Sequence, residues 1–108
     1  MTNIPQAVKH TLYVGLNDKI TKTQKIDTME AYKIAENILL NTCGGATIYN
    51  AMGIYKHEDG SIITENSLRI EIWACDENNV LNAAHLLKTA LNQESIGYTK
   101  ETVFSDFI

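Results

Sequence analysis

The stretch GIYKHEDGSIITENSLRIEIW, from Gly53 to Trp73, places the tightest restriction on the fold of this chain. Asp59-Gly60 at its centre is a strong hairpin-turn signal, because Asp and Gly tolerate the positive φ angles that a two-residue turn requires. The runs on either side, residues 46–57 and 61–74, are rich in β-branched and aromatic residues. The stretch therefore predicts two antiparallel strands joined by a tight turn.

Two positions in these strands indicate a local irregularity. Gly53 is typical of a bulge or of a close approach by another group, which leaves the register of Tyr55 open. The second run is one strand or a broken pair of strands, with Glu65-Asn66-Ser67 as the place of an irregularity. Whether pairing in this hairpin is continuous is therefore open.

Helical and strand patterns surround the hairpin. A first helix of about four turns begins at the N-cap Asp27, with Glu30 at the capping-box position, and stops at Gly44-Gly45. A second helix covers residues 76–93, and further strands are expected at 10–16, 96–99 and 101–104. The order β-α-β-β-α-β predicts an α+β fold of ferredoxin-like type. This is an antiparallel sheet with two helices on one face, with room for an extra C-terminal strand.

The alternation of side chains predicts an unusual second sheet face. Leu68, Ile70, Ile72 and Ala74 form the set that faces the helices, and Arg69, Glu71 and Trp73 point the other way. By the same alternation Tyr13, Thr47 and Tyr49 join the second set. This face is an exposed amphipathic surface, a subunit interface or a ligand platform; we favour the interface because aromatic residues and arginine are enriched there.

Composition excludes several classes of function. The 108 residues fit a single domain, 1–108, and the net charge of -4 with only one arginine argues against DNA or RNA binding. The apolar runs are too short to span a membrane, and residues 1–10 lack the apolar core of a signal peptide. Two cysteines without CxxC spacing indicate a reducing cytoplasm rather than a disulfide framework.

No pattern in the sequence identifies a reaction. The three histidines lack the spacing of a metal site, and Glu65, Glu71 and Glu94 are acids or bases without a recognisable nucleophile. Binding is better supported, because residues 17–25 and 91–95 supply amides, hydroxyls and lysines near strand and helix ends. In such a binding site, Arg69 is able to hold a phosphate and Tyr55 is able to stack on a base.

Four segments carry a resemblance to a known family. They are YVGLNDK at 13–19, GGATIYNAMGIYKHEDG at 44–60, ENSLRIE at 65–71 and LNQES at 91–95. Together they resemble small phage proteins of the anti-Thoeris sponge family over residues 13–98. The resemblance implies helices on an antiparallel sheet and assembly into a dimer or a dimer-based hexamer.

The resemblance also implies a function and a binding site. Members of this family sequester cyclic ADP-ribose isomers, and some also bind cyclic oligonucleotides, without cutting them. The chain would then be no enzyme, would need no cofactor or metal, and would block anti-phage defence in the cytoplasm of the bacterial host. The implied ligand-binding residues are Asn17, Lys19, Tyr55, Asn66, Arg69, Asn92 and Gln93. A second nucleotide pocket is less expected, because the chain has a single arginine.

Two other functions remain open at this point. One is a small enzyme acting on a nucleotide or another phosphorylated metabolite, with Glu71 or Glu65 beside Arg69. The other is a protein-interaction module whose aromatic sheet face docks a partner through Trp73.

Overall fold

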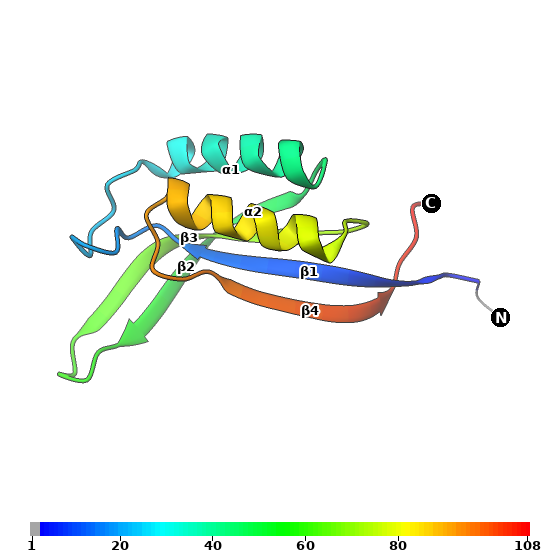
Figure 1. The fold of residues 1–108 in the computed structure, drawn as a ribbon. Coiled ribbons are helices and arrows are strands. Elements are labelled where there is room, and N and C mark those ends of the chain that lie inside the picture. The colour runs from blue at the N-terminus through cyan, green and yellow to red at the C-terminus, as the bar shows by residue number, and fades with distance from the viewer. Residues whose placement is uncertain (1–2) are drawn as a thin grey trace.

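The computed structural model describes residues 3–108 as a four-stranded sheet with two helices on one face (Figure 1). The elements are β1 (Gln6–Gly15), α1 (Thr28–Thr42), β2 (Thr47–Lys56), β3 (Ile62–Ile72), α2 (Glu77–Ala90) and β4 (Gly97–Phe104). The strand order is β2-β3-β1-β4, and every neighbouring pair is antiparallel. This confirms the predicted ferredoxin-like arrangement; residues 3–108 form no fifth strand.

The first helix, α1, is held by ordinary terminal interactions. Asp27 accepts a hydrogen bond from the backbone N–H of Met29 at 3.2 Å, which caps the start of α1. At the other end Gly44 has a φ angle of +80° and its N–H donates to the carbonyl of Leu39 at 3.0 Å. The predicted stop at Gly44 is therefore confirmed.

The core lies between the helices and one face of the sheet. The fully buried side chains of the strands are Leu12, Val14, Leu68, Ile70 and Ile72. Those of the helices are Ala31, Ala35 and Leu39 from α1 and Val80, Ala83 and Leu87 from α2. Small alanines at the contact let the helices pack closely on the sheet. Leu68, Ile70 and Ile72 face the helices as predicted. Trp73 and Ala74 do not continue the alternation, because β3 ends at Ile72 and Ala74 is exposed with a φ angle of +51°.

The hairpin is more regular than the sequence predicts. Pairing of β2 with β3 runs without a gap from Thr47↔Glu71 to Lys56↔Ile62. Gly53 therefore forms no bulge, and of the two alternatives for residues 61–74 the unbroken strand is the one observed. Asn66 and Ser67 pair in turn with Met52 and Ala51, so continuous pairing overrides the weak strand preference of these polar residues.

Two other strands also differ from expectation. β1 begins at Gln6 rather than His10, because β4 pairs with it as far as Gln6↔Phe104. β4 is one strand from Gly97 to Phe104 rather than two pieces. The turn at Asp59-Gly60 is confirmed: Gly60 has a φ angle of +89°, and Asp59 accepts the N–H of Ser61 at 2.9 Å.

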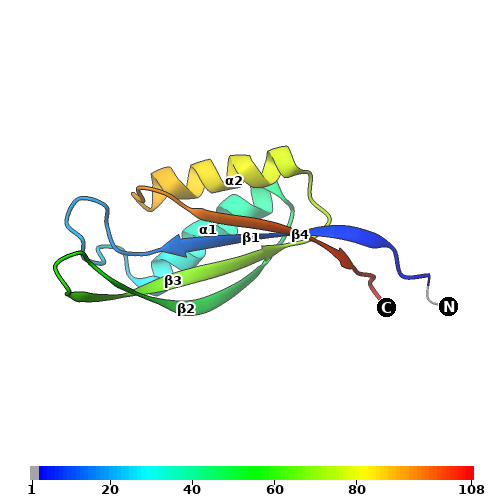
Figure 2. The same ribbon diagram turned by 90° about the horizontal axis from the view of Figure 1, so that it is seen from below.

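The sheet is longer than the helices that cover it. The molecule measures 53 × 30 × 22 Å. The β2–β3 hairpin runs past the helices at one end, and β1 with β4 runs past them toward the termini at the other (Figures 1 and 2). In residues 3–108 neither helix has the length and apolar character needed to cross a membrane.

Candidate functional site

The sheet face away from the helices, which we call the open face, carries ordered rows of polar and aromatic side chains. Arg69 pairs with Tyr49 on one side and with Tyr13 on the other, and Tyr13 pairs with Gly97. Figure 2 views the molecule from below, toward this side of the sheet. The predicted placement of Tyr13, Tyr49 and Arg69 on one face is confirmed.

Glu71 is the centre of a charged network on the open face. It is only 9% exposed, and it accepts hydrogen bonds from the Tyr49 hydroxyl at 3.1 Å and from Arg69 Nη2 at 2.9 Å. Lys9 Nζ lies 3.6 Å from the same carboxylate. The charge of Arg69 is therefore compensated within the fold, and Arg69 Nε is buried without a hydrogen-bond partner among residues 3–108.

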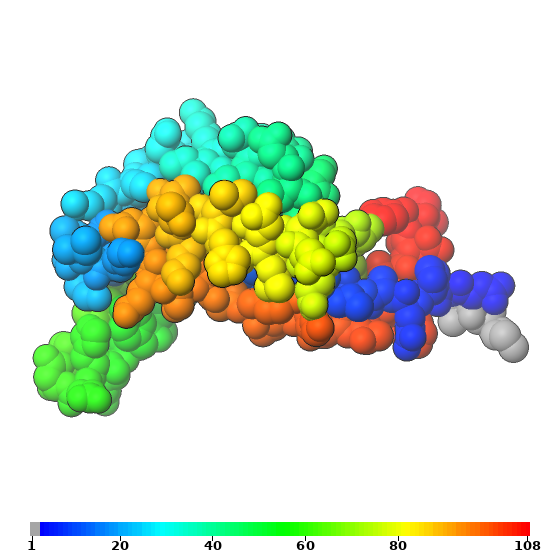
Figure 3. Space-filling model, viewed as in Figure 1, coloured from blue at the N-terminus to red at the C-terminus, as the bar shows by residue number. Residues whose placement is uncertain are grey.

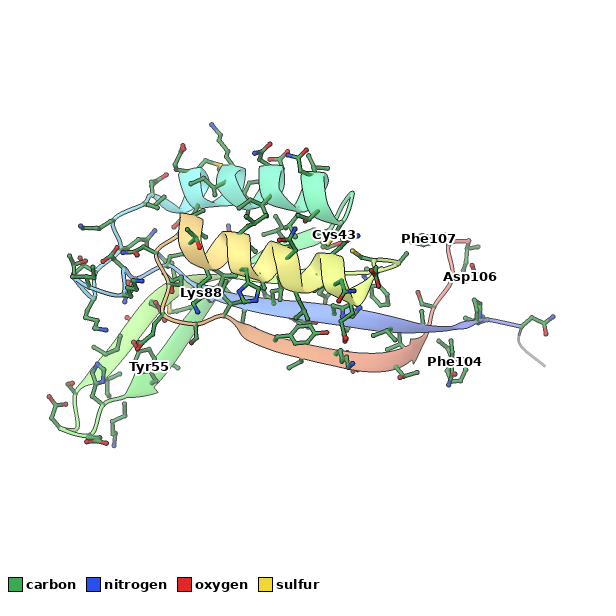
Figure 4. The ribbon with its side chains drawn as sticks, in the orientation of Figure 1. Cys43, Tyr55, Lys88, Phe104, Asp106 and Phe107 are labelled. Carbon is green, nitrogen blue, oxygen red and sulfur yellow. The ribbon has the colours of Figure 1, made fainter. Side chains whose placement is uncertain are left out.

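A cleft of about 550 Å³ lies beside this network, and we call it the open-face cleft. It is bounded by the end of β1, the β2–β3 hairpin and the segment that follows α2. Figure 4 shows Tyr55 on the hairpin side of this region. Its lining includes Tyr13, Gly15, Lys19, Met52, Gly53, Tyr55, Glu65, Ser67, Arg69, Gln93, Glu94 and Ser95.

Glu65 occupies a constrained position in the cleft. Its Oε2 accepts the backbone N–H of Asn17 at 3.0 Å. A Cβ atom placed on Gly15 would lie 2.7 Å from Oε1 of Glu65, so a side chain at residue 15 would displace the carboxylate from this position. Glu65 also lines a smaller adjoining cleft of about 160 Å³, together with Asn17 and Asn66.

The seven residues predicted to bind a ligand fall into three groups. Lys19, Tyr55, Arg69 and Gln93 line the open-face cleft. Asn17 and Asn66 line the smaller cleft next to it. Asn92 lines neither. The structure therefore brings most of the set to one end of the sheet, and their role in binding remains a prediction.

Several of these side chains already hold the fold together. Asn92 donates to Asp18 at 2.6 Å, and Gln93 donates to the carbonyl of Asn17 at 2.8 Å. Hydrogen bonds lower the pKa of Asp18 to about 2. The Asn92 amide makes the largest contribution, and the N–H groups of Thr21 and Ile20 make smaller ones. These contacts fasten the loop after β1 to the exit of α2. Asn92 therefore positions the loop that carries Lys19.

Sequence reasoning missed the place of the carboxylates in the cleft. The sequence pattern predicts roles for Glu65 and Glu94 as acids or bases, and it does not include them among the ligand-binding residues. Glu65, Ser67 and Arg69 alternate along β3 and so share its open face. The strand alternation was the available signal, and the open choice between one strand and a broken pair at residues 65–67 concealed it.

A second cleft of about 520 Å³ lies at the other end of the sheet and is less suited to a ligand. Two of its charged groups are already paired, because Lys100 lies 2.6 Å from Glu77, and Glu77 also accepts a hydrogen bond from the neighbouring Tyr98 hydroxyl at 3.2 Å. His10 Nδ1 lies 2.9 Å from the Tyr98 hydroxyl. Within residues 3–108, no three His, Cys, Asp or Glu side chains are grouped as a metal site.

Comparison with known proteins identifies the fold. No family model matches the chain, and no curated protein matches it. A phage SAM lyase in the apo state superimposes with a TM-score of 0.62 at 19% identity, covering 100% of this chain and 98% of the lyase. The lyase in complex with S-methyl-5′-thioadenosine gives a TM-score of 0.60 at 18% identity, covering 94% and 92%.

A second group of solved structures shares this fold. The divalent ion tolerance protein CutA1 from Ehrlichia chaffeensis gives a TM-score of 0.58 at 17% identity, covering 92% of this chain and 84% of CutA1. CutA from Synechococcus elongatus gives 0.58 at 11% identity, covering 91% and 78%. At these identities the likeness establishes a shared ferredoxin-like fold.

Proposed function

We propose that the chain binds a small adenosine-containing ligand in the open-face cleft and that S-adenosylmethionine is this ligand. The observation that carries the proposal is the position of the Glu65 carboxylate in the cleft. The carboxylate accepts a hydrogen bond from the Asn17 N–H and occupies the space that a side chain at residue 15 would fill. A fixed carboxylate favours a cationic group. The phage SAM lyase of the same fold, solved with S-methyl-5′-thioadenosine, supports this choice.

The charges in the cleft favour a cation over a doubly charged anion. Glu65 and Glu94 both line it, whereas Lys19 is the cation there that no ion pair within residues 3–108 engages. The charge of Arg69 is compensated by Glu71 at 2.9 Å. S-adenosylmethionine carries a sulfonium and an ammonium group, which suit two carboxylates. Its single carboxylate suits Lys19.

The aromatic residues of the cleft suit the rest of such a ligand. Tyr13 and Tyr55 are 46% exposed each, so part of each ring is open for stacking on an adenine, although Tyr55 also makes an edge-to-face contact with His57 at 5.4 Å. Ser67 and Ser95 add hydroxyl groups that can bond to ribose. Tyrosine rings also attract cations, so they favour binding of a ligand with a sulfonium group over binding of a neutral thioether.

We propose in addition that the bound ligand is cleaved. Release of S-methyl-5′-thioadenosine breaks the bond from sulfur to the amino-acid arm, and the electron pair of that bond goes to sulfur. The carboxylate of the same arm can attack the carbon that sulfur leaves, so no protein nucleophile is required. The cleft then acts by holding the arm in the reactive conformation, which is a large source of rate enhancement.

Sequestration of a cyclic ADP-ribose isomer is the second candidate. The resemblance to anti-Thoeris sponges favours it, as do Lys19 and Arg69 in the cleft, since both can pair with phosphate. On this reading the ligand stays intact, and an anti-phage defence signal is removed from the host cytoplasm. The two carboxylates in the cleft count against it, because they repel a diphosphate.

One experiment separates these readings. The purified protein is incubated with S-adenosylmethionine or with cyclic ADP-ribose isomers, its melting temperature is measured, and the ligand is recovered for mass spectrometry. We expect S-adenosylmethionine to be converted to S-methyl-5′-thioadenosine. Glu65→Gln should abolish conversion, whereas Glu58→Gln at the exposed hairpin tip should not alter it.

Each other outcome has a defined meaning. Intact S-adenosylmethionine with a raised melting temperature would show binding without cleavage. A shift with cyclic ADP-ribose isomers alone would favour sequestration. No shift and no conversion with any of these ligands would contradict the proposed site and favour a protein-interaction module.

A further inference from the structure

The two cysteines of the chain lie at matched positions beyond the paired ends of β2 and β3. Pairing of these strands ends at Thr47↔Glu71. Cys43 lies four residues before Thr47, and Cys75 lies four residues after Glu71. The register of the hairpin, continued past its last pair, therefore sets the two cysteines opposite each other.

The backbone also turns at matched positions, next to each cysteine. Gly44 follows Cys43 and has a φ angle of +80°, and Ala74 precedes Cys75 and has a φ angle of +51°. A positive φ angle is uncommon for a residue with a side chain, so the surroundings of Ala74 hold it in this conformation. Past these turns Cys43 is the C-cap of α1, and Cys75 comes directly before the N-cap of α2. Both cysteines therefore lie where a helix meets the sheet.

Other contacts bring the two cysteine segments together. Both cysteine side chains are partly buried and pack against the same hydrophobic core. Cys43 and Gly44 line a cleft of about 340 Å³ together with Trp73 and Ala74, and Figure 4 shows Cys43 at the C-terminal end of α1. The pKa of the Cys75 thiol is raised to about 12, first by burial and then by a side-chain interaction with Cys43. The two thiols are therefore neighbours.

We propose that Cys43 and Cys75 are a redox-active pair, which a peroxide oxidises to a disulfide bond within one chain. Both are free thiols in this structure. Opposed residues of an antiparallel pair have Cα atoms about 4.5–5.5 Å apart, inside the range of about 4.4–6.8 Å that a disulfide spans. Two cysteines held in this register can therefore form the bond with little movement of the backbone.

The reaction takes two steps. In the first, the Cys43 sulfur attacks one oxygen of hydrogen peroxide and the O–O bond breaks, which gives a sulfenic acid; the other oxygen leaves as water with the Cys43 proton. In the second, the Cys75 sulfur attacks the sulfenic sulfur, the S–S bond forms, and the sulfenic oxygen leaves as water with the Cys75 proton. The two thiols lose two electrons, and the peroxide gains them. Cys43 reacts first because the raised pKa keeps Cys75 protonated.

The bond would fasten the base of the β2–β3 hairpin. It closes a covalent loop from residue 43 to residue 75, and both strands of the hairpin lie within that loop. The space-filling view shows this hairpin standing out from the helices and the rest of the sheet (Figure 3). Tyr55 and Glu65 of the hairpin line the open-face cleft, so oxidation would also restrict the movement of that cleft. This last consequence rests on the proposed function, whereas the bond itself does not.

The test uses the full chain without ligand, with hydrogen peroxide as oxidant and dithiothreitol as reductant. Wild type, Cys43→Ser and Cys75→Ser are each treated, the remaining thiols are alkylated, and intact masses are measured. Oxidised wild type should lose two hydrogen atoms and take up no alkyl group, and proteolysis should give a peptide pair joined through Cys43 and Cys75. Its melting temperature should rise by about 10 °C, because the loop restricts the unfolded chain. Dithiothreitol should reverse this shift, and neither serine variant should show a reversible shift.

Dimedone, which labels sulfenic acids, tests the order of the two steps. Cys75→Ser keeps the sulfur that reacts first, so we expect it to be labelled about tenfold more than Cys43→Ser or better. Stronger labelling of Cys43→Ser would overturn the assigned order. Two free thiols in wild type after peroxide treatment would overturn the proposal, as would a covalent dimer in place of the internal bond. Because no sample contains ligand, such a failure is distinguishable from failure of the proposed function.

Discussion

Gly15 and Glu65 form the most restrictive contact in the candidate site, and it leads to a direct test. Gly15→Ala leaves the Glu65 carboxylate in the protein but forces it to move, because the added Cβ would lie 2.7 Å from Oε1. A charge-assisted hydrogen bond from the ammonium group of the ligand to this carboxylate would contribute about 1.5–3 kcal/mol, so its loss should make S-adenosylmethionine bind about tenfold more weakly or worse. Isothermal titration calorimetry measures this.

The control for this prediction is Gly45→Ala. A Cβ at Gly45 would meet no atom within 4 Å, and Gly45 lies in the loop before β2. Its affinity for the ligand should equal that of wild type. Equal affinity of Gly15→Ala and wild type would show that the position of Glu65 is unimportant for binding.

Asp18 predicts a pH dependence of stability. Its pKa is about 2 in the folded chain, against an ordinary value of 3.8, because the folded state stabilises the ionised form. A lowered pKa contributes stability that is complete above about pH 4 and is lost as the pH falls toward 2. Asp18→Asn lacks this contribution at every pH. We therefore expect the melting temperature of wild type to exceed that of Asp18→Asn at about pH 6 and to approach it near pH 2.5.

The quantity that tests Asp18 is the difference in melting temperature between wild type and Asp18→Asn at each pH. Hydrogen bonds to Ser61 lower the pKa of Asp59, and the interaction with Lys100 lowers the pKa of Glu77. Both carboxylates titrate in wild type and in the variant, so their effects cancel in the difference. A gap in melting temperature that does not change with pH would contradict the role given to ionised Asp18.

Elements could be predicted from the sequence wherever one local signal dominated. The alternation along residues 68–72 predicted the correct sheet face for each side chain. Gly44 predicted the C-terminal end of α1, and Gly60 predicted the turn of the β2–β3 hairpin. Residues 65–67 left a broken strand open as an alternative, because the pairing with β2 that outweighs their own preference cannot be read from local sequence. The cleft was only partly predictable. The contact of Glu65 with Gly15 joins residues fifty positions apart and depends on that same pairing.

The C-terminal end of α1 allows a matched comparison of two glycines. A Cβ at Gly44 or at Gly45 would meet no atom within 4 Å, but only Gly44 has a positive φ, of +80°. Alanine in this left-handed conformation costs about 1 kcal/mol. We expect Gly44→Ala to lower the free energy of unfolding by about that amount and Gly45→Ala to leave it nearly unchanged.

Equilibrium unfolding in urea measures both glycine variants. The dependence of the unfolding free energy on urea should stay the same, because neither change alters the surface that unfolding exposes. Equal destabilisation by the two substitutions would mean that the helix end tolerates a side chain at Gly44. The left-handed conformation would then not be what holds this terminus.

The elongated shape of the molecule predicts how its stability depends on concentration. Ribbons at both ends of a 53 Å molecule extend beyond the helices, and binding of a second copy over them would add stability that a single copy lacks. Unfolding is then linked to dissociation, and mass action requires the melting temperature to rise with protein concentration. Calorimetry of wild type at two concentrations about a hundredfold apart should show this rise.

Met52→Lys/Ile54→Lys isolates the contribution of the β2 edge to that rise. The variant should melt at one temperature at both concentrations, and that temperature should lie below the wild-type value at the higher concentration. Met29→Lys should keep the wild-type dependence, because its side chain lies on α1 away from both edges. A wild-type melting temperature that is independent of concentration would show that the ribbons are stable in a single copy.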